Sequence, residues 1–165
     1  MKISLRLLVV LALTGVLPAQ AALKVLATTP DWGALTTELG GERVNVYVAT
    51  TALQDVHRVE AKPSLVARAR SADLVVATGA ELEVGWLPVL IQESGNSRIQ
   101  PGAAGYFEAA SALRLLEVPS KLDRAMGDIH PQGNPHVQLD PHNIAAVAHA
   151  LTAKLGALEP AQAAY

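Results

Sequence analysis

The chain has 165 residues, of which 50% are apolar and 17% are charged, and its formal net charge is -2. This composition suits one domain with a substantial core, and the charge does not indicate a nucleic-acid partner or binding to an anionic membrane surface. The sequence contains no cysteine, which excludes disulfides, thiolate metal sites, cysteine nucleophiles and a lipid-bearing cysteine. Any bound metal must then be held by His, Asp and Glu.

The first residues have the three parts of a secretory signal peptide. Lys2 and Arg6 precede the apolar run at residues 7–13, and the segment ends in A-Q-A at residues 19–21. The apolar run is too short to cross a bilayer, which needs about 20 residues. We therefore predict a signal peptide over residues 1–21, export to the periplasm, and a mature domain over residues 22–165 without a membrane anchor.

The first half of the mature chain alternates between strand and helix signals. Residues 23–28 (LKVLAT) and 44–49 (VNVYVA) are short apolar runs typical of strands. Between them, Thr29 and Pro30 predict a helix start, with the Thr29 side chain as the cap, and Gly40-Gly41 predicts its end. Residues 50–62 lack periodicity and predict a loop, and Pro63 opens a helix that continues to about residue 70.

The second half continues the same alternation less regularly. Residues 73–78 (DLVVAT) predict a third strand, residues 81–92 a helix disturbed by Gly85 and Pro88, and residues 113–118 a further strand. Asp140-Pro141 starts a last helix, whose predicted apolar stripe is Ile144, Ala148, Leu151, Leu155 and Leu158. We therefore predict an α/β fold, with a parallel sheet flanked by helices on both faces.

The five histidines are the main candidates for chemistry. Neutral imidazole is a common zinc ligand, and ligands of parallel sheets bind beyond the carboxyl ends of the strands. His57 follows the second predicted strand and so occupies such a place, whereas His130 and His136 lie in a Gly- and Pro-rich segment. His142 and His149 are seven residues apart on the last helix, off its apolar stripe, and are interpreted as surface residues.

Other candidate groups are weaker. Glu81 and Glu83 point to different faces in either a helix or a strand, so their spacing does not make an acid–base pair. Trp32 and Trp86 are expected in the core rather than at a ligand. There is no H-E-x-x-H motif and no glutamate beside a candidate ligand, so we expect no zinc hydrolase and no enzymatic activity.

Four stretches, in order, resemble the periplasmic zinc- and manganese-binding proteins of ABC importers. They are residues 28–32 (TTPDW), residues 54–57 (QDVH) with 61–64 (AKPS), residues 72–79 (ADLVVATG) with Leu82-Glu83 and Trp86-Leu87, and residues 134–141 (NPHVQLDP). The resemblance implies that His57 and His136 bind the metal. It also implies that a second lobe supplies the remaining ligands, so residues 22–165 are expected to be the N-terminal lobe, ending where the linker helix starts.

The resemblance further implies capture of a divalent metal for an importer permease by a monomeric protein. Imidazole ligands favour zinc over manganese, which prefers carboxylate oxygens, so zinc is the expected ion and manganese the second candidate. The segment before His136 is short for the zinc-specific members, and His130 is its one histidine, a candidate auxiliary contact. An exported metal chaperone or adhesin that uses the same lobe is the alternative function.

Overall fold

The computed structural model describes residues 21–122 and 127–160. Four strands form one parallel sheet in the order β2-β1-β3-β4. Their bounds are β1 (Leu23–Ala27), β2 (Val44–Val48), β3 (Leu74–Ala77) and β4 (Tyr106–Glu108). The predicted signal peptide spans residues 1–21, and all of it except Ala21 lies outside the described residues.

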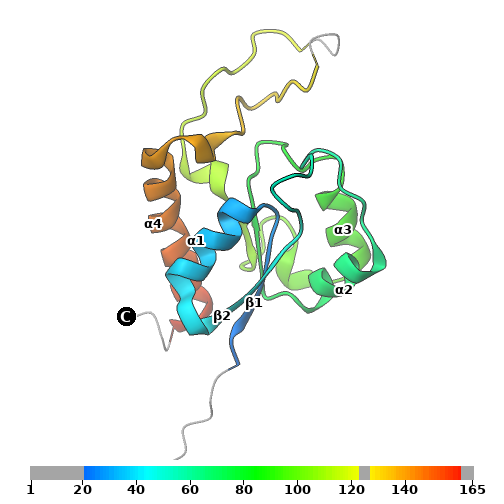
Figure 1. The fold of residues 1–165 in the computed structure, drawn as a ribbon, viewed down its shortest axis with the longest axis vertical. Helices are drawn as coiled ribbons and strands as arrows, with labels where there is room; N and C mark the ends of the chain where they lie inside the picture. The colour runs from blue at the N-terminus through cyan, green and yellow to red at the C-terminus, as the bar shows by residue number, and fades with distance from the viewer. Residues whose placement is uncertain (1–20, 123–126, 161–165) are drawn as a thin grey trace, which may run out of the picture.

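Four helices cover the two faces of the sheet (Figure 1). Helices α1 (Pro30–Gly40) and α4 (Pro141–Leu158) lie on one face, and α2 (Pro63–Ser71) and α3 (Leu87–Ser94) lie on the other. Trp32 and Leu151 fill the first core, and Leu65 and Leu90 fill the second. This confirms the predicted fold class, in which central strands β1 and β3 are buried on both sides.

Helices α1 and α4 start where the sequence predicts, but the predicted capping hydrogen bond of α1 is not formed. Pro30 lies in the first turn of α1, and Thr29 occupies the cap position as predicted. The Thr29 side chain makes no capping hydrogen bond, however, and its hydroxyl is buried without a partner. Capping by side chain occurs instead at α4, where Asp140 accepts from the backbone N–H of His142. The stripe of α4 includes Val147, which is fully buried, in place of Ala148.

Two predicted elements are wrong. Residues 113–118 are not a strand, and Leu116 and Val118 are exposed. The last strand is β4, only three residues long, whose Phe107 enters the core beside β3. It follows Gly105, where an added Cβ would collide with the carbonyl oxygens of Asp73 and Arg98. Its position is thus fixed by close backbone packing rather than by a local apolar run.

The predicted helix over residues 81–92 begins only at Leu87. Residues 80–86 form turns, and Ala80 and Glu81 adopt left-handed backbone angles, with φ of 50° and 66°. Such angles are costly for residues other than glycine and persist where the surroundings enforce them. Pro88 then lies in the first turn of α3, the one place where a helix accepts proline readily.

No helix within residues 21–122 and 127–160 is long and apolar enough to cross a membrane.

Candidate metal site

His57 lies in the loop over residues 50–62, which leaves the carboxyl end of β2. The Thr50 hydroxyl donates to the carbonyl of Thr28 at 2.8 Å, which joins the start of this loop to the end of β1. Further along, the indole N–H of Trp86 donates to the carbonyl of Val56 at 2.7 Å. The His57 side chain is 22% exposed. Its loop therefore reaches the edge of the sheet but is bonded to the body of the fold.

Asp55 orients the His57 ring. Its Oδ1 atom lies 2.8 Å from His57 Nδ1 and accepts the His57 backbone N–H at 3.0 Å. These two hydrogen bonds lower the pKa of Asp55. In the neutral imidazole the proton then belongs on Nδ1, facing the carboxylate, which leaves the lone pair of Nε2 available to a metal ion.

His130 faces that Nε2 atom from the long segment between β4 and α4. The two Nε2 atoms are 3.3 Å apart, and the two rings stack with centroids separated by 5.3 Å. Burial, together with the charges of His57 and His136, lowers the pKa of His130. The lowered pKa favours the neutral ring, which is the form that can bind a metal.

His136 completes a group of three rings. Its centroid lies 6.1 Å from that of His57 and 6.5 Å from that of His130. Asn134 accepts the His136 backbone N–H at 2.9 Å and donates to the Glu117 carboxylate at 2.7 Å. The flanking residues Pro135 and Val137 are buried, so an exposed His136 is carried by a backbone fixed on both sides.

The three rings do not yet form a closed coordination set. In the part of the chain that the structure describes, no three His, Cys, Asp or Glu side chains are arranged to hold one metal ion together. Glu81 and Asp128 line a cavity of about 190 Å³ together with His57 and His130. Carboxylates and imidazoles thus share one surface at the carboxyl edge of the sheet, where His57 and His130 are the closest two of the three imidazoles.

Glu83 has a structural role that its spacing in the sequence did not predict. Its carboxylate is 3% exposed and accepts the Thr28 hydroxyl at 2.6 Å and the backbone N–H groups of Thr78 and Gly79 at 2.8 and 3.1 Å. A buried charge needs such donors. Glu83 therefore joins the carboxyl ends of β1 and β3. The only earlier signal was its place in a family-like stretch.

The remaining aromatic and histidine predictions can be placed. Trp32 and Trp86 are both buried, as expected. His142 has a side chain that is 94% exposed, and His149 is exposed on α4, so both are surface residues as predicted.

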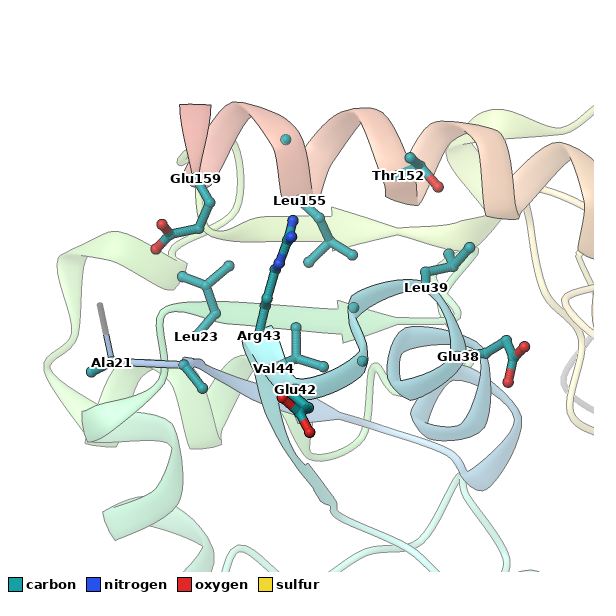
Figure 2. Close-up of a pocket in the computed structure, with 14 residues that line it drawn as sticks. Ala21, Leu23, Glu38, Leu39, Glu42, Arg43, Val44, Thr152, Leu155 and Glu159 are labelled. Atoms are coloured by element: carbon teal, nitrogen blue, oxygen red, sulfur yellow. The ribbon is translucent and has the colours of Figure 1, made fainter. Parts of the chain in front are cut away.

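A separate cavity lies away from the histidines, at the amino ends of β1 and β2. It measures about 660 Å³ and is lined by Leu23, Val44 and Leu155, with Glu38 and Glu42 among its polar residues (Figure 2). Leu23 and Val44 begin β1 and β2, whereas His57 follows the end of β2. This cavity and the three neighbouring histidines therefore lie at opposite ends of the sheet.

Comparison with known proteins bears on the fold and on the family of this chain. The crystal structure of ZnuA superposes with a TM-score of 0.69 at 23% identity, over 86% of this chain and 51% of that one. Zn(II)-bound AdcA from Streptococcus pneumoniae matches with a TM-score of 0.66 at 22% identity, over 87% of this chain and 28% of that one. These likenesses show the fold.

Sequence relatives agree. The manganese ABC transporter substrate-binding lipoprotein PsaA of Streptococcus mitis is 24% identical over 141 residues, which are 84% of this chain and 42% of the relative. This chain therefore spans less than half the length of that relative. The family described as zinc-uptake complex component A, periplasmic (ZnuA), matches residues 25–165. The chain belongs to that family.

Proposed function

We propose that this chain is the N-terminal, metal-capturing lobe of an extracytoplasmic solute-binding protein that delivers a divalent transition metal, preferably zinc, to an ABC importer. His57 and His136 are the proposed ligands, and His130 is an auxiliary contact. The observation that carries the proposal is the meeting of these three imidazoles at the carboxyl edge of the sheet, in a chain of the periplasmic zinc-uptake family.

The geometry between His57 and His130 supports an imidazole-bound ion. Two nitrogen ligands at about 2.0–2.1 Å from a tetrahedral zinc are separated by about 3.3–3.4 Å. The two Nε2 atoms are 3.3 Å apart, which supports the auxiliary role of His130. The His136 centroid lies 6.1 and 6.5 Å from those of His57 and His130, and we propose that its ring joins the same ion after a side-chain rotation.

Zinc is preferred because the neighbouring histidines are nitrogen donors, and manganese favours oxygen. Among the structural neighbours, AdcA is Zn(II)-bound and a periplasmic protein from Candidatus Liberibacter asiaticus is Mn-bound. The fold therefore accommodates either ion in its relatives. The choice between zinc and manganese must then depend on the ligand atoms at the site. Asp55 is already bonded to His57 Nδ1, but Glu81 and Asp128 line the same cavity as the pair, and their oxygens would raise the affinity for manganese.

Zinc needs about four ligands, and this chain offers the two proposed ligands His57 and His136 and the auxiliary contact His130. The remaining ligands are proposed to come from a second lobe, since the relatives are about twice as long as the matched region. The proposed setting follows from the amino-terminal segment: a signal peptide over residues 1–21, removal near Ala21, and a mature lobe over residues 22–165 in the periplasm. The proposed partner is the importer permease, which receives the ion from a monomeric protein.

The proposal is tested by measuring zinc affinity calorimetrically in the double variant His57→Ala/His136→Ala. Loss of two imidazole ligands should weaken zinc binding by at least about a hundredfold, given that each supporting group alone changes metal affinity by about 10–100-fold. The matched control is His142→Ala/His149→Ala, which removes two exposed histidines from α4 and should leave the affinity unchanged. Equal affinity of both double variants would refute the site.

A further inference from the structure

The turn over residues 80–86 contacts the His57 loop at two successive residues. The Trp86 indole N–H donates to the Val56 carbonyl at 2.7 Å. Gly85 lies against the next carbonyl, that of His57, so closely that an added Cβ would come within 2.9 Å of its oxygen. One short turn therefore bonds the carbonyl before the His57 Cα atom and lies close against the carbonyl after it.

The turn itself is firmly attached. Glu83, in its middle, joins it to Thr28 at the end of β1 and to Thr78 and Gly79 at the end of β3. Trp86, at its end, is 2% exposed and packs in the core between the sheet and helices α2 and α3. The turn can thus transmit the position of the sheet to whatever it contacts.

The His57 loop, in contrast, has little regular structure of its own. The backbone hydrogen bonds that begin within it, from Gln54, Arg58 and Lys62, all end within it. It contains neither helix nor strand. Its attachment comes from Thr50 at its start, from Val59 and Ala61 packed near its end, and from the contacts to Trp86 and Gly85 in its middle.

We propose that Trp86 and Gly85 are positioning residues for metal capture: they clamp the backbone on either side of His57 and so fix where its imidazole meets the ion. The proposal rests on the proposed function, because the ion is the reason why the position matters. The Asp55 carboxylate sets the orientation of the ring, and the clamp sets the place of the backbone that carries both residues. Preorganisation of this kind raises affinity because a ligand already in place loses less freedom on binding.

The chain contains a matched control for Trp86. Trp32 is 1% exposed, and its indole N–H also makes a buried hydrogen bond, to the Thr78 hydroxyl at 2.8 Å. That bond ends in the core beside β3 rather than in the His57 loop. Replacing either tryptophan by phenylalanine removes one indole hydrogen bond and a similar volume, so the two variants should lose similar stability.

The first measurement needs no metal. Arg58 follows His57, its side chain is 81% exposed, and trypsin cleaves after it when the loop opens. Losing a hydrogen bond worth about 1 kcal/mol raises the population of the open loop by about fivefold. In Trp86→Phe, cleavage after Arg58 relative to cleavage after Lys154 in α4 should rise by about that factor. In Trp32→Phe this ratio should stay within about twofold of wild type.

The second measurement is zinc affinity by calorimetry. Trp86→Phe should bind zinc about tenfold more weakly, the range seen when groups behind a ligand are removed, and Trp32→Phe should bind as wild type. In a His57→Ala background, Trp86→Phe should have no further effect, because it acts through His57. Equal zinc affinity of the two tryptophan variants would overturn the clamp while leaving the proposed function intact.

Gly85→Ala gives an independent test that keeps Trp86. The added methyl group must displace the His57 carbonyl, so faster cleavage after Arg58 and weaker zinc binding are expected again. If wild type and Gly85→Ala both fail to bind zinc, the proposed function falls and the clamp falls with it. Suppose instead that wild type binds zinc while Gly85→Ala is cut by trypsin after Arg58 at the wild-type rate and binds zinc with the wild-type affinity. In that case only the clamp is overturned.

Discussion

Two Asp-x-His segments of this chain have the same local geometry and different surroundings. In each, the Asp Oδ1 atom accepts the backbone N–H of the histidine two residues later and lies near its Nδ1 atom, at 2.8 Å for Asp55 and His57 and at 3.1 Å for Asp140 and His142. Both contacts lower the pKa of the aspartate. The Asp-x-His spacing therefore allows a carboxylate–imidazole pair to form in two different surroundings.

What separates the pairs is the environment of the ring. The Nε2 atom of His57 faces His130 at the carboxyl edge of the sheet, with a side chain only 22% exposed. The His142 side chain is 94% exposed, and its aspartate caps α4 instead. The same pair thus serves a candidate ligand in one place and a helix end in the other, which shows that tertiary placement, not the motif, makes the site.

The sharpest way to break this comparison is to neutralise each aspartate in turn. Asp55→Asn keeps an oxygen that can accept from His57 but removes the charge that strengthens its imidazole as a ligand, so zinc affinity should fall about tenfold. Asp140→Asn makes the same chemical change beside His142 and should leave zinc affinity unchanged. Calorimetric titration of both variants decides the matter, and equal losses would contradict different roles for the two pairs.

The reverse difference is expected for folding stability. Asp140→Ala removes the side chain that accepts from the first turn of α4, and loss of such a cap costs about 1 kcal/mol. Asp55 is exposed, in a loop without a helix to cap, so Asp55→Ala should change the free energy of unfolding by less than about 0.5 kcal/mol. Urea denaturation of the metal-free proteins measures both values. A larger loss for Asp55→Ala would mean that its pair also supports the fold.

The fold was predictable where the signal was local. The buried strands β1 and β3 and the proline-led starts of α1, α2 and α4 were recognised because β-branched runs and Pro positions reflect the conformation of the residues themselves. Strand β4 was missed because its three residues depend on pairing with β3 and on the close approach at Gly105. The late start of α3 depends on the turn that Glu83 organises.

The candidate site divides in the same way. His57 and His136 were singled out by their place in the chain and by family resemblance, and their metal binding stays a prediction. The contact between His57 and His130 joins residues 73 apart in sequence, so no local pattern could predict it. The same holds for Glu83, whose Thr28 partner is 55 residues away, and for the contact from Trp86 to Val56.

The smallest expected effect is a pH dependence that comes from His130, the ring that faces His57. Because the pKa of His130 is lowered in the folded protein, the unfolded chain takes up its proton first as the pH falls through about 6.5. The unfolded state then binds more protons, so the metal-free protein should lose stability between about pH 7 and pH 5. The lowered pKa values of Asp55 and Asp140 affect a different pH range: they stabilise the fold above about pH 4, and this stabilisation is lost at lower pH.

His130→Gln should therefore flatten the decline in melting temperature between pH 7 and pH 5, while the further decline below about pH 4, which comes from the two aspartates, should remain. Melting curves across that range measure it, and an equally steep decline in the variant would show that His130 is not the group responsible.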